Sequence, residues 1–484
     1  MIVVRRFFDA KLAQVSYLIG ASETRHAVVI DANRDVEQYI RAAAEEGVSI
    51  THVTETHIHA DFVSGSRELS ARTGARLLLS GEGGPEWQYA FAADAGAVLL
   101  EDGDRFDVGS VRVEVIHTPG HTPEHLTFLI TDTGALDEPL AAVTGDFLFV
   151  GDVGRPDLLE RAANFAGTME PAARALFGTL KRIEALPDHL QIWPGHGAGS
   201  ACGKGLGSLP QSTLGYERRT NWALRAMSED EFVARVLAGQ PDPPAYFAEM
   251  KRINKEGPKI LAAVQRPERL TLEEVQSLVR NGALVVDTRP AADFASGHLP
   301  GTINIPLNRA FTTWAGWLVP YDADSYLIVD GRSASYLEDA LRDLRLIGLD
   351  RVRGYATAGV VTESQARGDA IAHIEQINAK GAARRLAAGT AYVIDVRSAA
   401  EWQAGHLPGA HHIPLGELAR KVSTVPPEHA VIMHCQGGAR SAIAASVLQA
   451  GGLHDVLNLA GGFNEWRAAG LPVEEETAAT AAKR

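Results

Sequence analysis

Short, unbroken apolar runs punctuate the second half of the chain. They occur at Ala283–Asp287, Tyr326–Val329, Ala391–Asp395 and Ala430–Met433, and stretches with loop and helix character separate them. A strand covered by helices on both faces has no polar side, so it appears as a continuous apolar run. The pattern therefore predicts parallel sheets flanked by helices in this half of the chain.

An internal repeat sets the plan of that half. Asp287–Gly301 (DTRPAADFASGHLPG) reappears as Asp395–Gly409 (DVRSAAEWQAGHLPG), at a spacing typical of a small domain. We therefore predict two copies of one α/β fold. The expected boundaries are 268–365 for the first copy, 380–473 for the second, Gly239 to about Pro267 for a linker before them, and 474–484 for a tail.

The first part of the chain, 1–245, has a different pattern. Strand-like runs at Val28–Ile30, Arg76–Ser80 and Val111–Ile116 are interspersed with predicted helices at Val36–Glu46 and Pro171–Ala185. A mixture of this kind fits two sheets packed face to face between helical layers, an αβ/βα sandwich. The fold class that we expect for the whole chain is α/β.

Composition narrows the functions that the chain can have. Its 484 residues suggest about three domains. Its net charge of −14 gives nucleic acid or an anionic membrane no attraction from the overall field, and the sequence has no basic run or nucleic-acid motif, so we expect no nucleic-acid partner. The first residues lack the apolar core of a signal peptide, and no apolar run is long enough to span a membrane. Two cysteines exclude a disulfide framework and favour a reducing, cytoplasmic location.

Residues of metal-ligand type gather at predicted strand ends. The segment Thr56–Phe62 (THIHADF) contains His57, His59 and Asp61, and three more candidates follow in glycine-containing turns, at His121, Asp146 and His196. Four strand ends that all carry such residues predict a shared metal site. Isolated histidines are better explained as residues that cap strands and turns, namely His26, His52, His117, His125 and His189.

With these motifs, residues 1–235 resemble the metallo-β-lactamase superfamily. Phe62 stands where a two-metal member has a further histidine, which argues against a dinuclear zinc hydrolase of the glyoxalase II type. The persulfide dioxygenases of the superfamily hold one Fe(II), and the resemblance implies His57, His121 and Asp146 as its ligands. Such a site leaves open positions for substrate sulfur and the cosubstrate O2.

The resemblance also implies supporting roles for four further residues. His59, Asp61 and His196 are expected to orient ligands and water around the metal. Arg155, in a loop typical of these dioxygenases, either braces that loop by pairing with Asp157 or forms an ordinary surface pair.

Cys202 follows in a glycine-rich segment, where it is either a structural thiol or a thiol near the iron that receives or protects sulfane sulfur.

Cys435 lies in the loop between a strand and a helix predicted at Ala442–Ala450. Backbone N–H groups at a helix N-terminus stabilise a thiolate or a persulfide anion, and Arg440 adds positive charge. The loop, completed by Gln436, Gly437, Gly438, Ala439 and Ser441, is one residue shorter than that of the dual-specificity phosphatases. Residues 380–473 thus resemble an active rhodanese. The middle copy has Asp330 in place of the thiol, so we expect it to be catalytically inactive.

The order of the three parts resembles the bacterial enzymes that join a persulfide dioxygenase to rhodanese domains. It implies oxidation of a low-molecular-weight thiol persulfide to sulfite, coupled to sulfur transfer that makes or uses thiosulfate. The thiol (glutathione, coenzyme A, bacillithiol or another) and the direction of transfer stay open. A homo-oligomer, dimer or tetramer, is expected. The alternatives are a dinuclear zinc thioester hydrolase and a C-terminal half that only binds partners.

Overall fold

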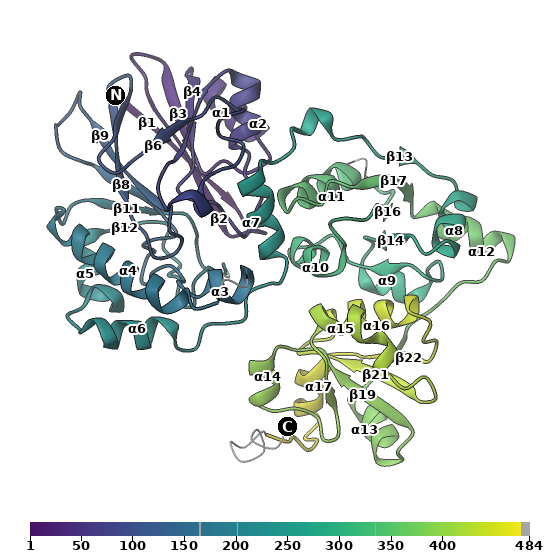
Figure 1. The fold of residues 1–484 in the computed structure, drawn as a ribbon. Coiled ribbons are helices and arrows are strands. Elements are labelled where there is room, and N and C mark those ends of the chain that lie inside the picture. The colour runs from purple at the N-terminus through teal and green to yellow at the C-terminus, as the bar shows by residue number, and fades with distance from the viewer. Residues whose placement is uncertain (164–165, 201, 334, 476–484) are drawn as a thin grey trace. The chain divides into compact units, whose positions relative to one another are not determined.

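The computed structural model describes residues 1–163, 166–200, 202–333 and 335–475, and the chain forms two units (Figure 1). The first unit comprises Met1–Val264 with the short segment Leu344–Gly348, and the second comprises Gln265–Asp343 and the chain from Leu349 onward. Most of the predicted tail, 474–484, lies outside the described residues. No helix among the described residues combines the length and apolarity needed to cross a membrane.

The first unit contains two six-stranded sheets. The first has the order β1-β2-β3-β4-β5-β6, with β1 Ile2–Asp9, β2 Gln14–Ala21, β3 His26–Ile30, β4 Ser49–Thr54, β5 Arg76–Ser80 and β6 Val98–Leu100. The second has the order β12-β11-β10-β9-β8-β7, with β7 Arg105–Val108, β8 Val111–His117, β9 Leu126–Asp132, β10 Ala141–Gly145, β11 Gln191–Pro194 and β12 Ser212–Thr213.

Three apolar layers hold these sheets together. Ile19 of β2 and Phe128 of β9 meet in the core between the sheets. Tyr39 packs on the outer face of the first sheet, and Leu176 and Phe232 pack on the outer face of the second. The helices that cover the sheets are α1 Glu37–Glu45, α2 Ser66–Thr73, α3 Leu158–Ala163, α4 Met169–Arg182, α5 Leu214–Thr220, α6 Glu229–Leu237 and α7 Phe247–Glu256. The predicted αβ/βα sandwich is confirmed.

The second unit holds two five-stranded sheets with the same topology, as the repeat predicts. The middle copy has the order β13-β17-β16-β14-β15, from β13 Glu268–Arg269, β14 Leu284–Asp287, β15 Ile303–Asn304, β16 Ser325–Val329 and β17 Val352–Thr357. The C-terminal copy has the order β18-β22-β21-β19-β20, from β18 Glu375–Ile377, β19 Ala391–Asp395, β20 His411–His412, β21 Ala430–His434 and β22 Val456–Leu459. Their strands pair in parallel.

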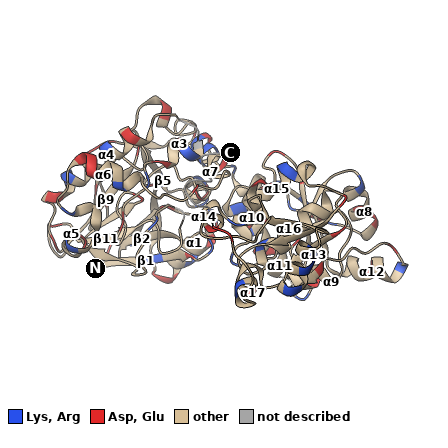
Figure 2. Ribbon diagram, turned by 90° about the horizontal axis from the view of Figure 1, so that it is seen from below, with Lys and Arg blue, Asp and Glu red and all other residues tan. Residues whose placement is uncertain are grey.

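Helices flank both sheets of the second unit (Figure 1). They are α8 Leu272–Arg280, α9 Ala291–Ser296, α10 Phe311–Leu318, α11 Ser335–Leu346 and α12 Gly359–Arg367 in the middle copy, and α13 Ala379–Ala387, α14 Ala399–Gln403, α15 Leu415–Lys421, α16 Ala439–Ala450 and α17 Gly462–Ala468 in the C-terminal copy. Acidic and basic residues are interspersed along the elements of both units (Figure 2).

The repeated motif forms an equivalent buried arginine–aspartate ion pair in each copy, and we call this pair with its carbonyl contact the staple. Arg397 donates hydrogen bonds to both Asp395 carboxylate oxygens, to the Gly405 carbonyl oxygen and to Gln436 Oε1, at 2.7–3.1 Å. Arg289 binds Asp287 and the Gly297 carbonyl oxygen in the same way. The staple therefore ties the end of one strand to the loop after the following helix.

The segment 239–267, expected as a linker, contains α7. Asn254 on this helix donates from Nδ2 to the carbonyl oxygens of His59 and Phe62, at 2.8 and 2.7 Å. Its Oδ1 accepts a hydrogen bond from the Ser64 N–H at 2.8 Å. The helix thus belongs to the first unit and fixes the histidine-containing loop, a long-range role that local sequence patterns do not reveal.

Arg397→Ala should destabilise the C-terminal copy. The change leaves the carboxylate of Asp395, which is fully buried, without its main partner, and breaking a buried ion pair costs about 3–5 kcal/mol. Cys435 is 1% exposed, so urea-dependent labelling of this thiol reports the unfolding of its own copy. The labelling midpoint should fall for Arg397→Ala and stay unchanged for the exposed control Arg467→Ala; equal midpoints would show that the staple contributes little.

Candidate metal centre and sulfur-carrier loop

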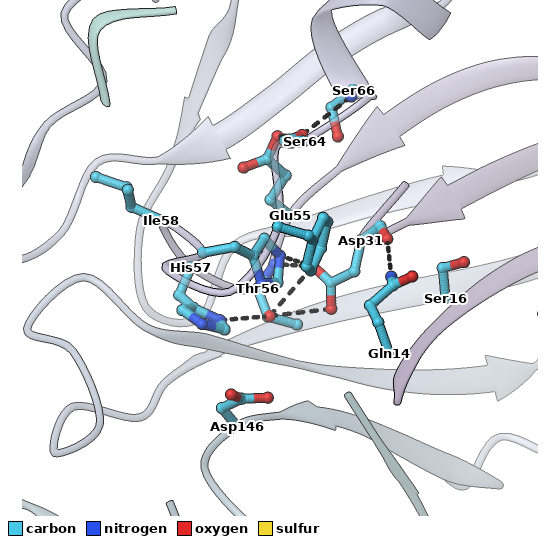
Figure 3. A network of polar contacts seen from close by, with 12 residues as sticks. Gln14, Ser16, Asp31, Glu55, Thr56, His57, Ile58, Ser64, Ser66 and Asp146 are labelled. Carbon is cyan, nitrogen blue, oxygen red and sulfur yellow. Dashed lines mark hydrogen bonds and ion pairs between the residues drawn. The ribbon is translucent and has the colours of Figure 1, made fainter. Parts of the chain in front are cut away.

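A chain of hydrogen bonds orients His57 after β4 (Figure 3). Asp31, which directly follows β3, accepts hydrogen bonds from the Thr56 N–H at 2.7 Å and from the Thr56 hydroxyl at 3.0 Å. The same hydroxyl lies 2.9 Å from His57 Nδ1. Because the hydroxyl proton goes to Asp31, its oxygen accepts the Nδ1 proton, which leaves the Nε2 lone pair available for a metal ion.

Three predicted ligands converge in the first unit. One ligand atom from each of His57, His121 and Asp146 lies within 4.8 Å of the other two, and all three side chains are buried. His57 Nε2 and Asp146 Oδ2 have no hydrogen-bond partner, and His121 Nε2 lies 3.6 Å from Asp146 Oδ2. Buried polar atoms without partners are costly, and a metal cation would satisfy these two atoms together. The residues present therefore fit a metal site.

The surroundings keep the three groups in the protonation states that bind metal. Burial, reinforced by the neighbouring histidines, lowers the pKa of His57 well below its usual value. Burial also lowers the pKa of His121. Burial alone would raise the pKa of Asp146, but His196 outweighs it, so the pKa falls below its usual value. Two neutral imidazoles and one carboxylate result.

His196 and His59, for which the sequence analysis expects supporting roles, both lie within hydrogen-bonding distance of buried carboxylates. His196 lies between two carboxylates, with Nε2 2.6 Å from Asp61 Oδ2 and Nδ1 2.7 Å from Asp146 Oδ1. Burial would lower the pKa of His196, yet Asp146 and Asp61 raise it well above its usual value. His59 Nε2 lies 3.1 Å from Asp31 Oδ1. The Phe62 ring packs beside the His59 ring, with centroids 4.3 Å apart.

Cys202 lies at the metal centre. It is 2% exposed, and its thiol groups with Asp61 and His196 so that one ligand atom of each lies within 4.8 Å of the others. Burial, followed by the charges of Asp61 and Asp146, raises the pKa of the thiol well above its usual value. In the absence of a cation the group is therefore a neutral thiol.

The Arg155–Asp157 pair is buried, not a surface pair. Arg155 donates to both Asp157 carboxylate oxygens at 3.1 and 2.6 Å and to the Pro241 carbonyl oxygen at 2.7 Å. The Arg155 carbonyl oxygen lies 3.2 Å from His121 Nδ1 and accepts its proton. The pair thus braces the loop whose backbone orients His121 toward the metal position.

Two residues of the site escaped the sequence analysis. Asp31 lies outside the motif that it orients. His125, interpreted as a capping residue, lies against His57 with ring centroids 5.1 Å apart, and its Nε2 accepts a hydrogen bond from the Asp146 N–H at 3.2 Å. The available signal was position alone, because Asp31 directly follows β3 and His125 directly precedes β9.

In the C-terminal copy, Cys435 follows β21 and faces the start of α16. The Gly438 N–H donates to Cys435 Sγ at 3.1 Å, and the Ser441 hydroxyl lies 3.5 Å from the same sulfur. The helix begins at Ala439, not at Ala442 as predicted, because Gly438 adopts φ 94°, a left-handed conformation that glycine favours. Ala439, Arg440 and Ser441 therefore form the first turn of α16.

The remaining loop residues are held from outside the loop. Gln436 Nε2 donates to Asn464 Oδ1 at 2.5 Å. Arg440 forms a two-pronged ion pair with Glu401, with both N···O distances 2.7 Å. Burial would raise the pKa of Glu401, but the bonds from Arg440 and Ser398 lower it to about 2. At Gly437 no atom lies within 4 Å of the position that a β-carbon would occupy.

In the middle copy, Asp330 stands at the position that corresponds to Cys435 and forms an ion pair with Arg332. Asp330 accepts hydrogen bonds from the Arg332 N–H at 3.1 Å and from its Nε at 2.7 Å. A carboxylate cannot carry sulfane sulfur, and no cysteine lies between residues 203 and 434 of the sequence. The middle copy has the same frame as its neighbour without the thiol.

Comparisons with known proteins agree with this architecture. Residues 10–196 match the metallo-beta-lactamase superfamily, and residues 271–357 and 378–469 match the rhodanese-like domain. A crystal structure of a metallo-beta-lactamase from Staphylococcus aureus is 42% identical, with a TM-score of 0.67, and covers 74% of this chain and 99% of that one. The chain belongs to the metallo-β-lactamase superfamily, and it carries two rhodanese-like domains.

Within the superfamily, several relatives differ in their named activities. The persulfide dioxygenase ETHE1 of Mus musculus is 30% identical over 241 residues, 48% of this chain and 79% of that protein. A hydroxyacylglutathione hydrolase of Rhodospirillum rubrum is 29% identical, over 49% of this chain and 80% of that protein. The chain spans 54% of the length of a beta-lactamase hydrolase-like protein from Xylella fastidiosa, to which it is 27% identical over 48% of its own length.

Thr56→Val should weaken metal binding by about 10- to 100-fold, the usual effect of removing a group that orients a histidine ligand. Titration of the metal-free protein with Fe(II) under anaerobic conditions measures the change, and His57→Ala provides the reference for full loss of the site. Thr51→Val is a matched control, because the Thr51 hydroxyl bonds to His52 Nδ1 at 3.0 Å outside the site. Equal affinity in both valine variants would contradict the role of Thr56.

The Arg440–Glu401 pair should make the stability of the C-terminal copy depend on pH. The pKa of Glu401 is lower in the folded protein than in the unfolded chain, so its contribution is fully present above about pH 4.5 and is lost as pH falls toward about 2. The urea midpoint of wild type should therefore exceed that of Glu401→Gln at pH 6, and the two should converge as the solution is acidified. A constant difference between the two proteins would refute this linkage.

Proposed function

We propose that the chain is a persulfide dioxygenase joined to a working sulfurtransferase. The carrying observation is the convergence of two neutral histidines and one carboxylate, His57, His121 and Asp146, on one buried position. The net reaction combines RSSH, O2 and H2O to give RSH, sulfite and two protons. The terminal sulfur is oxidised, O2 is reduced, and the sulfur–sulfur bond is broken.

Fe(II), when bound, supplies adjacent open positions at which sulfur and O2 react. The protein's own groups position and protect that reaction. Asp31 and Thr56 fix the tautomer of His57, and the Arg155 carbonyl fixes that of His121. His196 lies between Asp61 and Asp146 and is set to hold a proton there. Burial of the cluster excludes bulk water, which strengthens each of these interactions.

A dinuclear zinc thioester hydrolase is the second candidate. The hydroxyacylglutathione hydrolase relative and the grouping of Asp61, His196 and Cys202 favour it. Against it, Phe62 cannot ligate, and Asp61 and His196 already bind each other at 2.6 Å, a contact that a second ion would have to replace. One metal ion per chain with persulfide-dependent O2 consumption supports the dioxygenase, and two zinc ions with none support the hydrolase.

Cys435 carries sulfur in the second reaction that we propose. A Cys435 persulfide anion attacked by sulfite gives thiosulfate and the Cys435 thiolate, and the reverse reaction uses thiosulfate. The Gly438 N–H and the Ser441 hydroxyl stabilise the sulfur anion in either direction. Arg440, positioned by Glu401, adds a cation beside the loop where anions arrive. Sulfite links the two activities as the product of one and the acceptor of the other.

For Cys202 we propose a role at the metal centre, receiving or protecting sulfane sulfur, because its thiol lies with Asp61 and His196. A cytoplasmic location and a dimeric or tetrameric state stay predictions. The same holds for the domain boundaries and for the identity of the thiol that carries the persulfide.

Replacing each cysteine should separate the two activities. Cys435→Ser should lower thiocyanate formation from thiosulfate and cyanide by about a thousandfold or more, as expected for a lost nucleophile, while persulfide-dependent O2 uptake persists. Cys202→Ser should do the opposite and lower O2 uptake alone. If Cys202→Ser leaves O2 uptake unaltered, Cys202 is structural. Full sulfurtransferase activity in Cys435→Ser would exclude Cys435 as the carrier.

A further inference from the structure

Lys251 is a charged side chain buried in the first unit. It lies on α7, is 8% exposed, and places its ammonium 4.1 Å from the centroid of the Trp87 ring. No hydrogen bond or close ion pair joins this ammonium to another residue in the described part of the chain. Burying an unpaired ammonium costs free energy, which an arriving anion would recover.

The Lys251 side chain lines a pocket that reaches the metal centre. His121 and Thr122 form its polar wall, and Leu158, Leu159 and Phe247 form its apolar wall. The pocket is small, with about 280 Å³ of unfilled space that includes its opening to solvent. The pocket is therefore narrow, and a ligand can enter it only with a slender end.

The charges around the pocket leave Lys251 available to a ligand. Burial lowers its pKa to about 8, so the ammonium is still mostly protonated at pH 7. Glu124 supplies the main opposing charge, but one of its oxygens already accepts the Ile58 N–H at 2.9 Å. Burial raises the pKa of Glu124, which further favours its neutral form. Among the described residues, no carboxylate therefore forms a close ion pair with the Lys251 ammonium.

We propose that Lys251 binds a carboxylate on the organic part of the persulfide, so that the enzyme selects persulfides whose carboxylate lies a few atoms from the sulfur. This inference rests on the proposed persulfide chemistry. His121 is both a wall of the pocket and a proposed metal ligand, so a carboxylate held by Lys251 would lie in a pocket that borders the metal position. The apolar wall of Leu158, Leu159 and Phe247 suits the methylene carbons between the two ends.

A matched pair of substrates tests the proposal. The persulfides of 3-mercaptopropionate and 2-mercaptoethanol are similarly short, and only the first carries a carboxylate. With the iron-loaded full-length enzyme, wild type should show the lower KM for the acid. Lys251→Met should raise that KM by about 10- to 100-fold, as expected for one lost hydrogen bond between charged groups, with little change in KM for the alcohol. Lys251→Arg should retain part of the preference.

Two controls separate this role from a structural one. Lys255→Met removes a lysine from the same helix whose ammonium donates to the Glu86 carbonyl oxygen at 2.7 Å, and it should change neither KM. Metal content and thermal unfolding should match wild type in all three variants. Equal KM values for the two substrates in wild type, or a preference for the acid that survives in Lys251→Met, would overturn the proposal.

Calorimetric binding of the two free thiols to the metal-loaded protein distinguishes failure of the inference from failure of the proposed function. If no persulfide supports O2 uptake but 3-mercaptopropionate binds more tightly than 2-mercaptoethanol, and only when Lys251 is present, the dioxygenase assignment falls and the carboxylate site stands. If O2 uptake proceeds and neither thiol is preferred, the dioxygenase stands and the carboxylate site falls.

Discussion

The burial of several ionisable side chains in one small volume is the constraint on which the first unit depends. Asp31, Asp61 and Asp146 lie inside it together with histidines from four strand ends. Away from water, each charge is stable only beside a partner of opposite charge or a hydrogen-bonding group. Removing one partner leaves the other as an uncompensated buried charge. His196 between two carboxylates and Thr56 between Asp31 and His57 satisfy this demand. The protein thereby fixes the geometry and protonation of the metal ligands through its own hydrogen bonds.

The two rhodanese-like copies share the same structural contacts but differ in the residue at the reactive position, which is Cys435 in one and Asp330 in the other. Arg289 and Arg397 make equivalent buried ion pairs, and His298 and His406 stack on Phe294 and Trp402 with ring centroids 3.7 and 3.6 Å apart. In both copies these contacts join the C-terminal end of one strand (β14 or β19) to the loop after the following helix (α9 or α14). The Asp–Arg ion pair and the ring stack are the same in both copies although the loop residues differ, so one copy presents a thiol to backbone N–H groups while the other pairs an aspartate with its own arginine.

Sequence patterns predicted the features whose signals are local. The unbroken apolar runs gave the parallel strands and the repeat gave two like copies. Ligand-type residues near strand ends gave a set of six candidates, from which the family resemblance selected His57, His121 and Asp146, and these three side chains do converge. The α7 helix was missed because it lies in a stretch bounded by prolines and glycines, and its purpose is visible only through Asn254, which binds a loop almost two hundred residues earlier. The early start of α16 was missed because it depends on the conformation of one glycine, Gly438.

The charge of the protein opposes the chemistry proposed for it. Persulfide, sulfite and thiosulfate are anions, whereas the chain carries a net charge of −14, so the overall field does not attract them. Positive potential must come from local groups placed where the anions react. The start of α16 and the Arg440 guanidinium supply it beside Cys435, and Lys251 supplies it beside His121. Glu401 forms a close ion pair with Arg440, whereas Lys251 has no such close pair among the described residues and feels only the more distant Glu124. The metal centre is therefore the site better equipped to discriminate among anionic ligands.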